Sequence, residues 1–409
     1  MLDPRPSESR TTAGRGRVLA LLSLALILSM STWFSASAVI PQLRSDWDLG
    51  SSGAAWLTIA VQLGFVVGAL SAALLNLSDV FRPQRVILAG ALAAALANGL
   101  IVFADGPLTA LPLRFLTGAA LAQVYPPALK VMATWYREGR GTALGILVGA
   151  LTVGSALPHL VNGLGGLDWR LVIIVTSALT VAGGLIAARV PDGPFPFPRA
   201  AFDPGQARRA LSNRGVRLAT LGYFGHMWEL YAMWAWFVIF FGAALEERGQ
   251  TGGSAAAFAT FAVIGVGGIG CWIGGVLGDR WGRTQTTALM MAVSGACALS
   301  IGLFFGDPTV FVLIIGLIWG FSVVADSAQF STIVTELADQ KYVGTALTLQ
   351  LALGFILTVA TIWLLPFVED AVSWRWAFVL LAPGPALGIV AMLRLRAAPE
   401  ARLIAGGRG

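Results

Sequence analysis

Long stretches without a charged residue dominate this chain. A helix needs about 20 mostly apolar residues, with a range of roughly 17–25, to cross the hydrocarbon of a bilayer. Nine stretches without Asp, Glu, Lys or Arg meet this need: 18–43, 50–78, 86–104, 141–167, 171–188, 249–278, 284–306, 342–368 and 376–393. Three more are apolar with isolated ionisable residues: 107–134, 216–245 and 308–335. The pattern therefore predicts twelve transmembrane helices.

The fold class that follows is an all-α polytopic membrane protein. Open strand edges cannot exist in lipid, and the strands of membrane barrels are much shorter than these stretches. Only 12% of the residues are charged and 56% are hydrophobic, whereas a soluble domain has roughly 25% charged residues. The first stretch is longer than the apolar core of a signal peptide and has no small-residue cleavage site, so we expect a retained membrane anchor.

Basic residues predict how the chain is oriented. With the N-terminus placed inside, 22 of the 27 Lys and Arg residues fall on the inner side. Four fall outside: Arg44, Arg170, Arg248 and Arg375. This bias predicts that both termini are cytoplasmic in the inner (plasma) membrane. It also accounts for the net charge of +6 without a nucleic-acid partner, so the expected surroundings are the lipid bilayer.

Short matches recur about 200 residues apart and indicate two related halves. Gly-Thr-Ala-Leu begins at Gly141 and again at Gly344, and Trp-Arg begins at Trp169 and again at Trp374. An internal duplication of a six-helix unit explains these offsets. The predicted organisation is a cytoplasmic tail (1–17), a first bundle (18–189), a cytoplasmic linker (190–215), a second bundle (216–396) and a second tail (397–409).

The most specific local pattern is "GGVLGDRWGRT" at 274–284, between the eighth and ninth spans. It resembles an inner-loop motif of the major facilitator superfamily, Gly-x-Leu-x-Asp-Arg-x-Gly-Arg. The matching residues are Gly275, Leu277, Asp279, Arg280, Gly282 and Arg283. The first-half copy keeps Leu77, Asp79 and Arg85 but has Leu75 and Arg82 in place of glycines. The resemblance implies two six-helix bundles that transport a solute by alternating access.

The loop residues suggest an inner gate. Glycine turns let helix ends approach closely, a helix N-terminus stabilises a nearby Asp, and arginines pair with carboxylates. We expect Glu336 to pair with Arg283, and Glu138 to pair with Arg82 or Arg85. Such pairs would close the inner side while the transporter opens outward. The alternative is that the arginines only anchor the inner ends of the spans.

Ionisable side chains within the spans are few, because each costs roughly 2.5–3.5 kcal/mol on insertion. The candidates for the proton-coupling or solute cavity are Arg114 and Tyr125 on span 4, His159 on span 5, His226 and Glu229 on span 7, and Asp326 and Gln329 on span 10, with Trp33 on span 1. The resemblance implies that spans 1, 4, 7 and 10 line the central cavity. Arg114 with Gly118 also matches a family pattern, Arg-x-x-x-Gly, linked to proton coupling.

Glu229 is the leading candidate for a proton carrier or solute contact. Burial disfavours the charged form of a carboxylate and a nearby cation restores it, so we expect His226, one turn away, to tune Glu229. The alternative is a structural carboxylate bonded to a hydroxyl, a tryptophan N–H or an arginine. Structural roles are also open for Asp326, Arg114 and His159.

No metal-ligand spacing, nucleotide-binding loop or nucleophile constellation appears, so we expect no cofactor and no enzyme activity. Energy would come from an ion gradient or from the gradient of the solute. The sequence predicts a monomeric secondary active transporter for a small polar or charged solute, coupled to protons. Two alternatives stay open: an uncoupled facilitator, and a receptor or enzyme on the same scaffold.

Overall fold

The computed structural model describes residues 8–136, 139–166, 168–195, 203, 205, 207–250, 252–339 and 343–409. Its first part contains α1 (Glu8–Ser29), η1 (Met30–Thr32), η2 (Ser37–Val39), α2 (Ile40–Trp47), α3 (Ser51–Leu74), α4 (Leu77–Val80), α5 (Pro83–Gly99), η3 (Leu100–Phe103), α6 (Pro107–Leu121), α7 (Tyr125–Ala133), α8 (Arg140–Leu164) and α9 (Trp169–Ala187). Its second part contains α10 (Ala207–Ala210), α11 (Arg214–Glu246), α12 (Gly253–Gly265), α13 (Gly267–Trp281), α14 (Arg283–Ser300), η5 (Ile301–Phe304), α15 (Thr309–Ala325), α16 (Ser327–Leu337), α17 (Val343–Ala377), η6 (Phe378–Leu381), α18 (Pro383–Arg396) and η7 (Pro399–Leu403).

The predicted twelve spans are present. Within the described part of the chain, ten helical stretches are long and apolar enough to cross a membrane. One of them, Val343–Arg396, runs through a kink at Ser373, where φ is 67°, and accounts for spans 11 and 12. Span 4 adds the last crossing as two shorter helices, α6 and α7.

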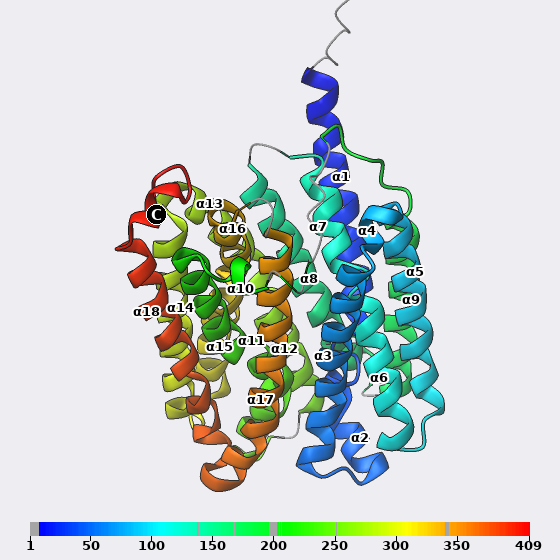
Figure 1. Ribbon diagram of the computed structural model, residues 1–409. Helices are drawn as coiled ribbons and strands as arrows, with labels where there is room; N and C mark the ends of the chain where they lie inside the picture. The colour runs from blue at the N-terminus through cyan, green and yellow to red at the C-terminus, as the bar shows by residue number, and fades with distance from the viewer. Residues whose placement is uncertain are drawn as a thin grey trace, which may run out of the picture.

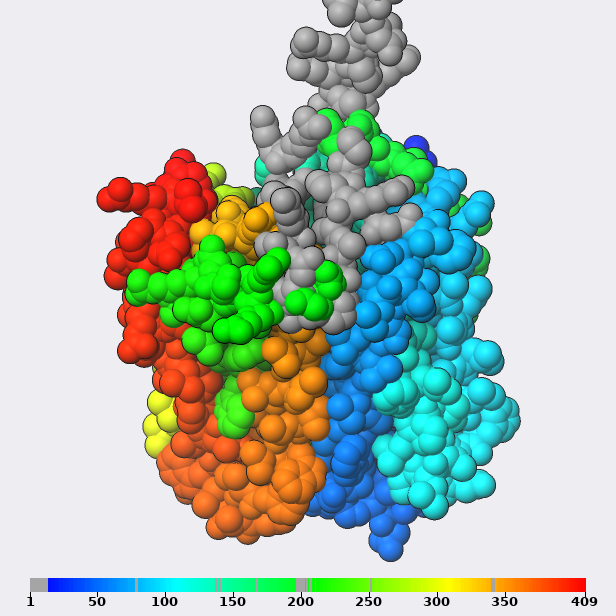
Figure 2. Space-filling view, viewed as in Figure 1, coloured from blue at the N-terminus to red at the C-terminus, as the bar shows by residue number. Residues whose placement is uncertain are grey.

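The two predicted halves lie side by side. Figure 1 shows α3, α5, α6 and α9 on one side and α13, α14, α15 and α18 on the other, with the start of α1 and the C-terminus at the upper end. We call the surface where the halves meet the seam. Along it α3 packs against α17, and α8 packs against α12 and α13. Figure 2 shows the blue α3 and the orange α17 in contact along one face.

Glycines bring the helix backbones together within each half. A Cβ atom added at Gly64 would lie 1.9 Å from the carbonyl oxygen of Phe115, and one at Gly118 would lie 2.0 Å from that of Val61. The second half repeats this arrangement, since a Cβ at Gly320 would lie 1.7 Å from the carbonyl oxygen of Val263. Small residues at such crossings are typical of membrane helices, which associate mainly through close packing.

Several spans are broken near their middle. Span 1 leaves the α-helix after Ser29 and passes through η1 and η2 before α2. Its hydroxyls compete for backbone groups: Ser35 Oγ donates to the carbonyl of Thr32 at 3.0 Å and Thr32 Oγ1 donates to that of Ser29 at 3.4 Å. Such bonds offer the backbone an alternative to the helix. The break places Trp33 at the seam.

Spans 4 and 10 break at related positions. Span 4 turns just before Tyr125, and the two prolines that follow have no N–H to donate. Span 10 breaks at Asp326, the residue between α15 and α16. These breaks put Tyr125 and Asp326 at corresponding depths of the two halves, as expected for a duplicated unit.

Candidate functional site

Aromatic rings from both halves fill the middle of the seam. The ring centroids of Trp33 and Phe65, from the first half, lie 4.7 Å apart. Phe65 lies 4.7 Å from Phe355 of the second half, and Phe355 lies 5.1 Å from Tyr231. All four side chains are buried. This aromatic cluster joins spans 1 and 2 to spans 7 and 11.

Two indole N–H groups, one in this cluster and one beside it, have no hydrogen-bond acceptor among the described residues. They belong to Trp33 of the first half and Trp234 of the second, and both side chains are buried. Tyr231 lies between them, with ring centroids 5.9 Å from Trp33 and 5.5 Å from Trp234. An unsatisfied buried donor costs about 1–3 kcal/mol. The arrangement therefore offers two donors, one from each half, to a water or a solute.

Further buried polar atoms without partners lie on helices that meet at the seam. Both amide atoms of Gln62 on α3 and the amide nitrogen of Gln350 on α17 are unpaired. Both ring nitrogens of His159 on α8 are also unpaired, and its side chain is fully buried. The structural role considered for His159 therefore has no hydrogen bond to support it among the described residues.

Arg114 lies within the first half and holds the break in span 1. Its Nη1 donates to the carbonyl of Thr32 at 2.9 Å, its Nη2 donates to that of Trp33, and its Nε donates to that of Leu57 at 3.2 Å. Nη1 also reaches Ser35 Oγ at 3.1 Å and Asn98 Oδ1 at 3.3 Å. All of these acceptors are neutral groups of the first half. The structure thus does not join Arg114 to Glu229 or Asp326.

Glu229 is held by two neighbouring helices. Its Oε2 accepts from Ser294 Oγ of α14 at 2.9 Å, and its Oε1 accepts from Trp319 Nε1 of α15 at 2.7 Å. His226, which was expected to tune Glu229, makes its ionisable contact with Asp326 instead. The observed contacts are those of the alternative, a carboxylate bonded to a hydroxyl and a tryptophan N–H. Sequence reasoning did not single out Ser294 or Trp319, because which helices border span 7 is a tertiary property.

His226 and Asp326 form a separate buried pair at the break in span 10. Nδ1 of His226 lies 2.9 Å from Oδ1 of Asp326, and the two side chains are 1% and 2% exposed. Among the described residues, Nε2 of His226 and Oδ1 of Asp326 have no hydrogen-bond partner, and the contact is an ion pair only when the imidazole is protonated. The rings of Tyr223 and Phe330 pack around the imidazole, with centroids at 6.0 and 5.5 Å.

The inner loop between α13 and α14 carries a second set of candidate residues, which we call the inner-gate cluster: Asp279, Arg283, Gln329 and Glu336. Arg283 donates to both carboxylate oxygens of Glu336 at 3.0–3.2 Å, as predicted from the sequence. Its Nη1 lies 3.1 Å from Asp279 Oδ1. Asp279 also accepts from Thr142 Oγ1 of the first half at 3.2 Å, so the cluster reaches across the seam.

Gln329 belongs to this cluster and not with the candidate cavity residues. Its Oε1 accepts from Arg283 Nη1 at 2.9 Å, and its Nε2 donates to the carbonyl of Gly274 at 3.3 Å. Span 10 breaks at Asp326, so Gln329 lies on α16, a different helix from Ser322. That break separates Gln329 from the part of span 10 that precedes Asp326.

Other expectations for the loop need correction. Gly275 lies inside α13, and only Gly282 forms the turn, with φ 106°. Asp279 is in the last turn of α13, so the dipole of that helix does not stabilise it, and Arg283 and Thr142 do so instead. Arg280 is exposed.

In the part of the chain that the structure describes, the first-half copy of the loop makes fewer side-chain contacts than the second-half copy. Arg85 is exposed. Arg82 pairs with Asp192 at 2.9 Å, with both side chains more than half exposed, so the pair contributes only about 0–1 kcal/mol. The side chain of Asp79 lies outside the described residues, as does the whole of Glu138, the expected partner of Arg82 or Arg85.

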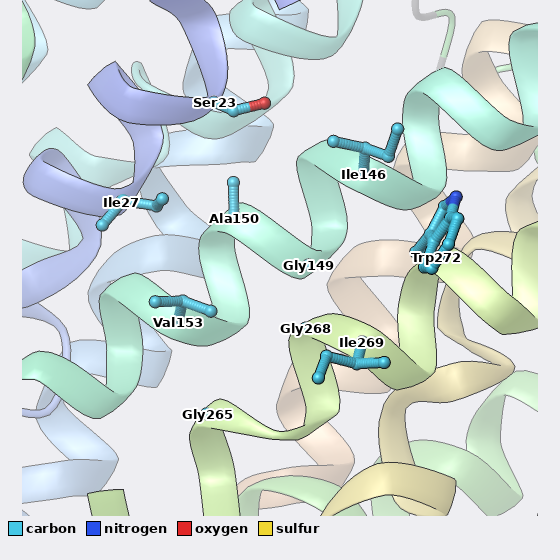
Figure 3. A pocket seen from close by; sticks show the side chains of 10 residues that line it. All are labelled: Ser23, Ile27, Ile146, Gly149, Ala150, Val153, Gly265, Gly268, Ile269 and Trp272. Carbon is cyan, nitrogen blue, oxygen red and sulfur yellow. The ribbon is translucent and has the colours of Figure 1, made fainter. Parts of the chain in front are cut away.

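A pocket of about 390 Å³ lies to one side of the aromatic cluster, between α1, α8 and the α12–α13 break. Figure 3 shows its lining, which is apolar apart from Ser23. Gly149 and Gly268 approach each other there from opposite halves. Trp272 on its rim is 51% exposed. This apolar pocket does not offer the polar partners that a charged solute requires.

The sequence as a whole matches the model of the Major Facilitator Superfamily over residues 22–362. The chain belongs to this superfamily. As a member it has the multi-pass membrane fold of this superfamily, in agreement with the resemblance of its inner-loop motif. The enzyme alternative finds no support, since its relatives and structural neighbours are transporters.

Relatives in this superfamily include transporters for different solutes. Cephamycin export protein CmcT of Amycolatopsis lactamdurans is 28% identical over 223 residues, which cover 51% of this chain and 45% of that protein. The match to YgaY of Escherichia coli, an uncharacterized transporter, is 29% identical and covers 40% of this chain and 41% of that protein. The chain thus spans less than half the length of these two relatives. Probable sulfoacetate transporter SauU of Cupriavidus necator is 26% identical, covering 86% of this chain and 79% of that protein.

Solved structures share the fold. A bacterial homologue of the human lysosomal transporter Spinster, in an inward-facing conformation, superposes with a TM-score of 0.67 at 15% identity, covering 94% of this chain and 96% of that one. The Escherichia coli fucose–proton symporter FucP gives a TM-score of 0.66 at 16% identity, covering 92% and 98%. At these identities the likeness shows the fold alone.

Proposed function

We propose that this protein is a proton-coupled secondary transporter that moves a small organic anion across the inner membrane by alternating access. The site for the anion is the aromatic cluster in the seam, extended by Trp234. Both bundles contribute to this site, so a solute bound there contacts each half. Relative motion of the halves would then expose the solute first to one side of the membrane and then to the other.

The observation that carries this proposal is the pair of unsatisfied indole N–H groups of Trp33 and Trp234. An indole N–H can only donate, so its partner must be an acceptor. Carboxylate and sulfonate oxygens are strong acceptors, and the flat rings around them suit the apolar part of a small solute. The relative named as a probable sulfoacetate transporter moves such an organic anion.

Arg114 supports the choice of an anion. Its positive charge is buried, and all the acceptors that the structure gives it are neutral. Two of them are the backbone carbonyls of Thr32 and Trp33, so the charge lies beside the backbone of a seam residue. A buried cation without a nearby carboxylate favours an anion in its surroundings. The contribution is electrostatic and requires no direct contact with the solute.

Proton coupling is assigned to the carboxylates of the second half. Asp326 has an ionisable partner, His226, within contact distance, and Glu229 lies on the same helix as His226 one turn away. A proton that binds to these side chains reduces their total negative charge. The electrostatic repulsion between them and an anion in the seam then becomes weaker. An uncoupled facilitator would contain such groups only as structural pairs.

Flux measurements in vesicles test both parts of the proposal. Purified protein is reconstituted and the uptake of radiolabelled sulfoacetate and related small organic acids is measured with and without an imposed pH gradient. Trp33→Phe and Trp234→Phe keep an aromatic ring but remove the donor. Each is expected to raise the half-saturating solute concentration about 5–150-fold, the range for a lost hydrogen bond of roughly 1–3 kcal/mol. Trp281→Phe, at an exposed position, is the matched control.

The coupling groups are tested in the same vesicles. Asp326→Asn and Glu229→Gln are expected to abolish uptake driven by the pH gradient while exchange of labelled for unlabelled solute persists. Unchanged gradient-driven uptake in both variants would contradict proton coupling, and wild-type uptake insensitive to pH would favour the facilitator. Indole variants that transport as well as wild type would remove the proposed solute site.

A further inference from the structure

The carboxyl-terminal segment folds back onto the inner-gate cluster. After α18 the chain forms η7 and then turns toward the loop between α13 and α14. Figure 1 shows this red segment over the upper end of the second half, close to the labels of α13 and α16. Ile404 is fully buried in a cluster that includes Phe330, Leu337 and Leu395. The sequence predicted only a tail at 397–409.

Three hydrogen bonds join the segment 404–409 to the cluster and its loop. The backbone N–H of Ala405 donates to Glu336 Oε2 at 3.2 Å. Arg408 Nη1 donates to the backbone carbonyl of Asp279. The backbone N–H of Thr284 donates to the carbonyl of Gly409 at 3.2 Å, so the segment also satisfies a donor in the first turn of α14.

Residues on both sides of this contact have positive φ angles, and the glycine on one side leaves room for the other. Gly282 has φ 106°, and a Cβ atom there would lie 2.4 Å from the carbonyl oxygen of Arg408. On the other side, Ala405, Gly406 and Gly407 have φ of 50°, 66° and 96°. A left-handed conformation is costly for alanine and persists only where the surroundings hold it. The glycine of the loop motif thus provides the space that the segment occupies.

We propose that residues 404–409 form a clasp that belongs to the inner gate and must leave Glu336 and Asp279 before that gate opens. The proposal rests on the alternating-access function proposed above. Asp279 links the two events, because its backbone carbonyl accepts from Arg408 while its carboxylate accepts from Thr142 of the first half. Glu336 is shared in the same way, since Arg283 and Ala405 donate to the same oxygen.

Release of the clasp therefore loosens both ends of the Asp279–Arg283–Glu336 chain. Without Ala405, Glu336 has one donor fewer to fix its position beside Arg283. Without Arg408, the last turn of α13 loses a contact that holds it where Thr142 can reach Asp279. The clasp stabilises the state in which the inner side of the seam is closed, and its loss favours the open state.

A cysteine placed in the seam reports on that state in the full-length protein. A Cβ atom at Gly275 lies 3.5 Å from the carbonyl oxygen of Gly141, an ordinary contact across the seam. Gly275→Cys is made with Cys271→Ala and Cys297→Ala, and a membrane-impermeant maleimide is added to inside-out vesicles. The rate of labelling is compared after adding Arg408→Ala or Ile404→Asp. Arg402→Ala is the matched control, since this arginine lies in η7, just before the segment, and is exposed.

Both clasp variants are expected to label at least about fivefold faster than the control, the factor for one lost hydrogen bond of roughly 1 kcal/mol. Cleavage of the segment by proteinase K, which needs no basic residue, measures its release independently. A released segment with unchanged labelling would overturn the clasp. Because labelling needs no solute, faster labelling in a protein that moves no anion keeps the clasp and rejects the proposed function.

Discussion

At the scale of single residues, Arg114 shows how a buried charged side chain can supply hydrogen-bond donors to backbone carbonyls. The guanidinium takes the place of missing helical N–H groups where span 1 unwinds, and it binds carbonyls that the break leaves open. Its planar set of five donors suits this task, whereas a lysine has three donors around one point. The sequence identified Arg114 as unusual because of its depth in the membrane. It could not show that the partners would be carbonyls of two other spans.

Replacing Arg114 is therefore expected to destabilise the fold before it affects solute binding. Arg114→Lys keeps the charge but cannot reproduce all the bonds of the planar guanidinium to the carbonyls of Thr32, Trp33 and Leu57, at about 1.5–3 kcal/mol for each bond lost. The melting temperature in detergent should fall clearly, and Arg114→Leu should lower it further. Arg85→Leu, at an exposed position, is the control. An Arg114→Lys protein as stable as wild type would show that these bonds do not support the break.

At the scale of helices, the close crossings depend on glycine more than on side-chain packing. The backbones of α3 and α6 touch at Gly64 and Gly118. The distance between these two helices is therefore set by backbone contact at the glycines and not by side chains. The absence of charged residues predicts where the spans are, because the free-energy cost of a charge in lipid applies to each stretch independently of its neighbours. The breaks are harder to predict because they depend on neighbours, as Ser35 with Asn98 illustrates: its hydroxyl donates to an amide on span 3 at 2.6 Å.

Gly118→Ala should thus be more harmful than a methyl group suggests. Its Cβ would lie 2.0 Å from a backbone oxygen, which forces α3 and α6 apart and costs about 1–3 kcal/mol or more. Gly242→Ala on α11 is the matched variant, because a Cβ there meets nothing within 4 Å. It should leave stability unchanged or raise it by about 0.5–1 kcal/mol. Thermal unfolding of both proteins decides, and equal melting temperatures would contradict the crossing argument.

The same limits apply to the candidate site. Glu229, Asp326 and His226 could be chosen from the sequence because charges within spans are rare. Their partners could not, since the neighbours of span 7 are set by packing: Ser294 and Trp319 reach Glu229 from helices 65 and 90 residues away in sequence. The pairing of Arg283 with Glu336 was predictable because the family motif places an arginine at the inner end and few carboxylates lie there.

At the scale of the whole molecule, α8 follows the second half along its entire length. Gly163 approaches Phe258 near one end, Gly149 approaches Gly268 in the middle, and Thr142 donates to Asp279 near the other end. Alternating access requires that such contacts open at one end at a time. The contact at the inner end is a hydrogen bond between polar side chains. The contact in the middle is between glycine backbones, and the contact at the far end is between an aromatic ring and a glycine.

A disulfide across the inner end should stop the cycle. In a protein with Cys271→Ala and Cys297→Ala, Thr142→Cys and Gly275→Cys place two thiols across the seam, with a Cβ at residue 275 lying 3.5 Å from the Cα of Thr142. Cβ atoms in disulfides lie about 3.5–4.5 Å apart. Oxidation is expected to abolish solute flux in vesicles and reduction to restore it, while each single cysteine variant transports in both conditions. Flux through the oxidised double variant would mean that the inner seam need not part.

The contrast between spans 1 and 7 has a mechanical consequence. The two spans are related by duplication, yet span 7 is one continuous helix of 33 residues, α11, while span 1 has given up its helical hydrogen bonds around Trp33. A continuous helix resists bending, because bending strains its backbone hydrogen bonds. The interrupted span 1 can bend at its break and disrupt few α-helical hydrogen bonds. A molecule seated between them would push against a rigid wall on one side and a compliant one on the other, so the first half would yield first.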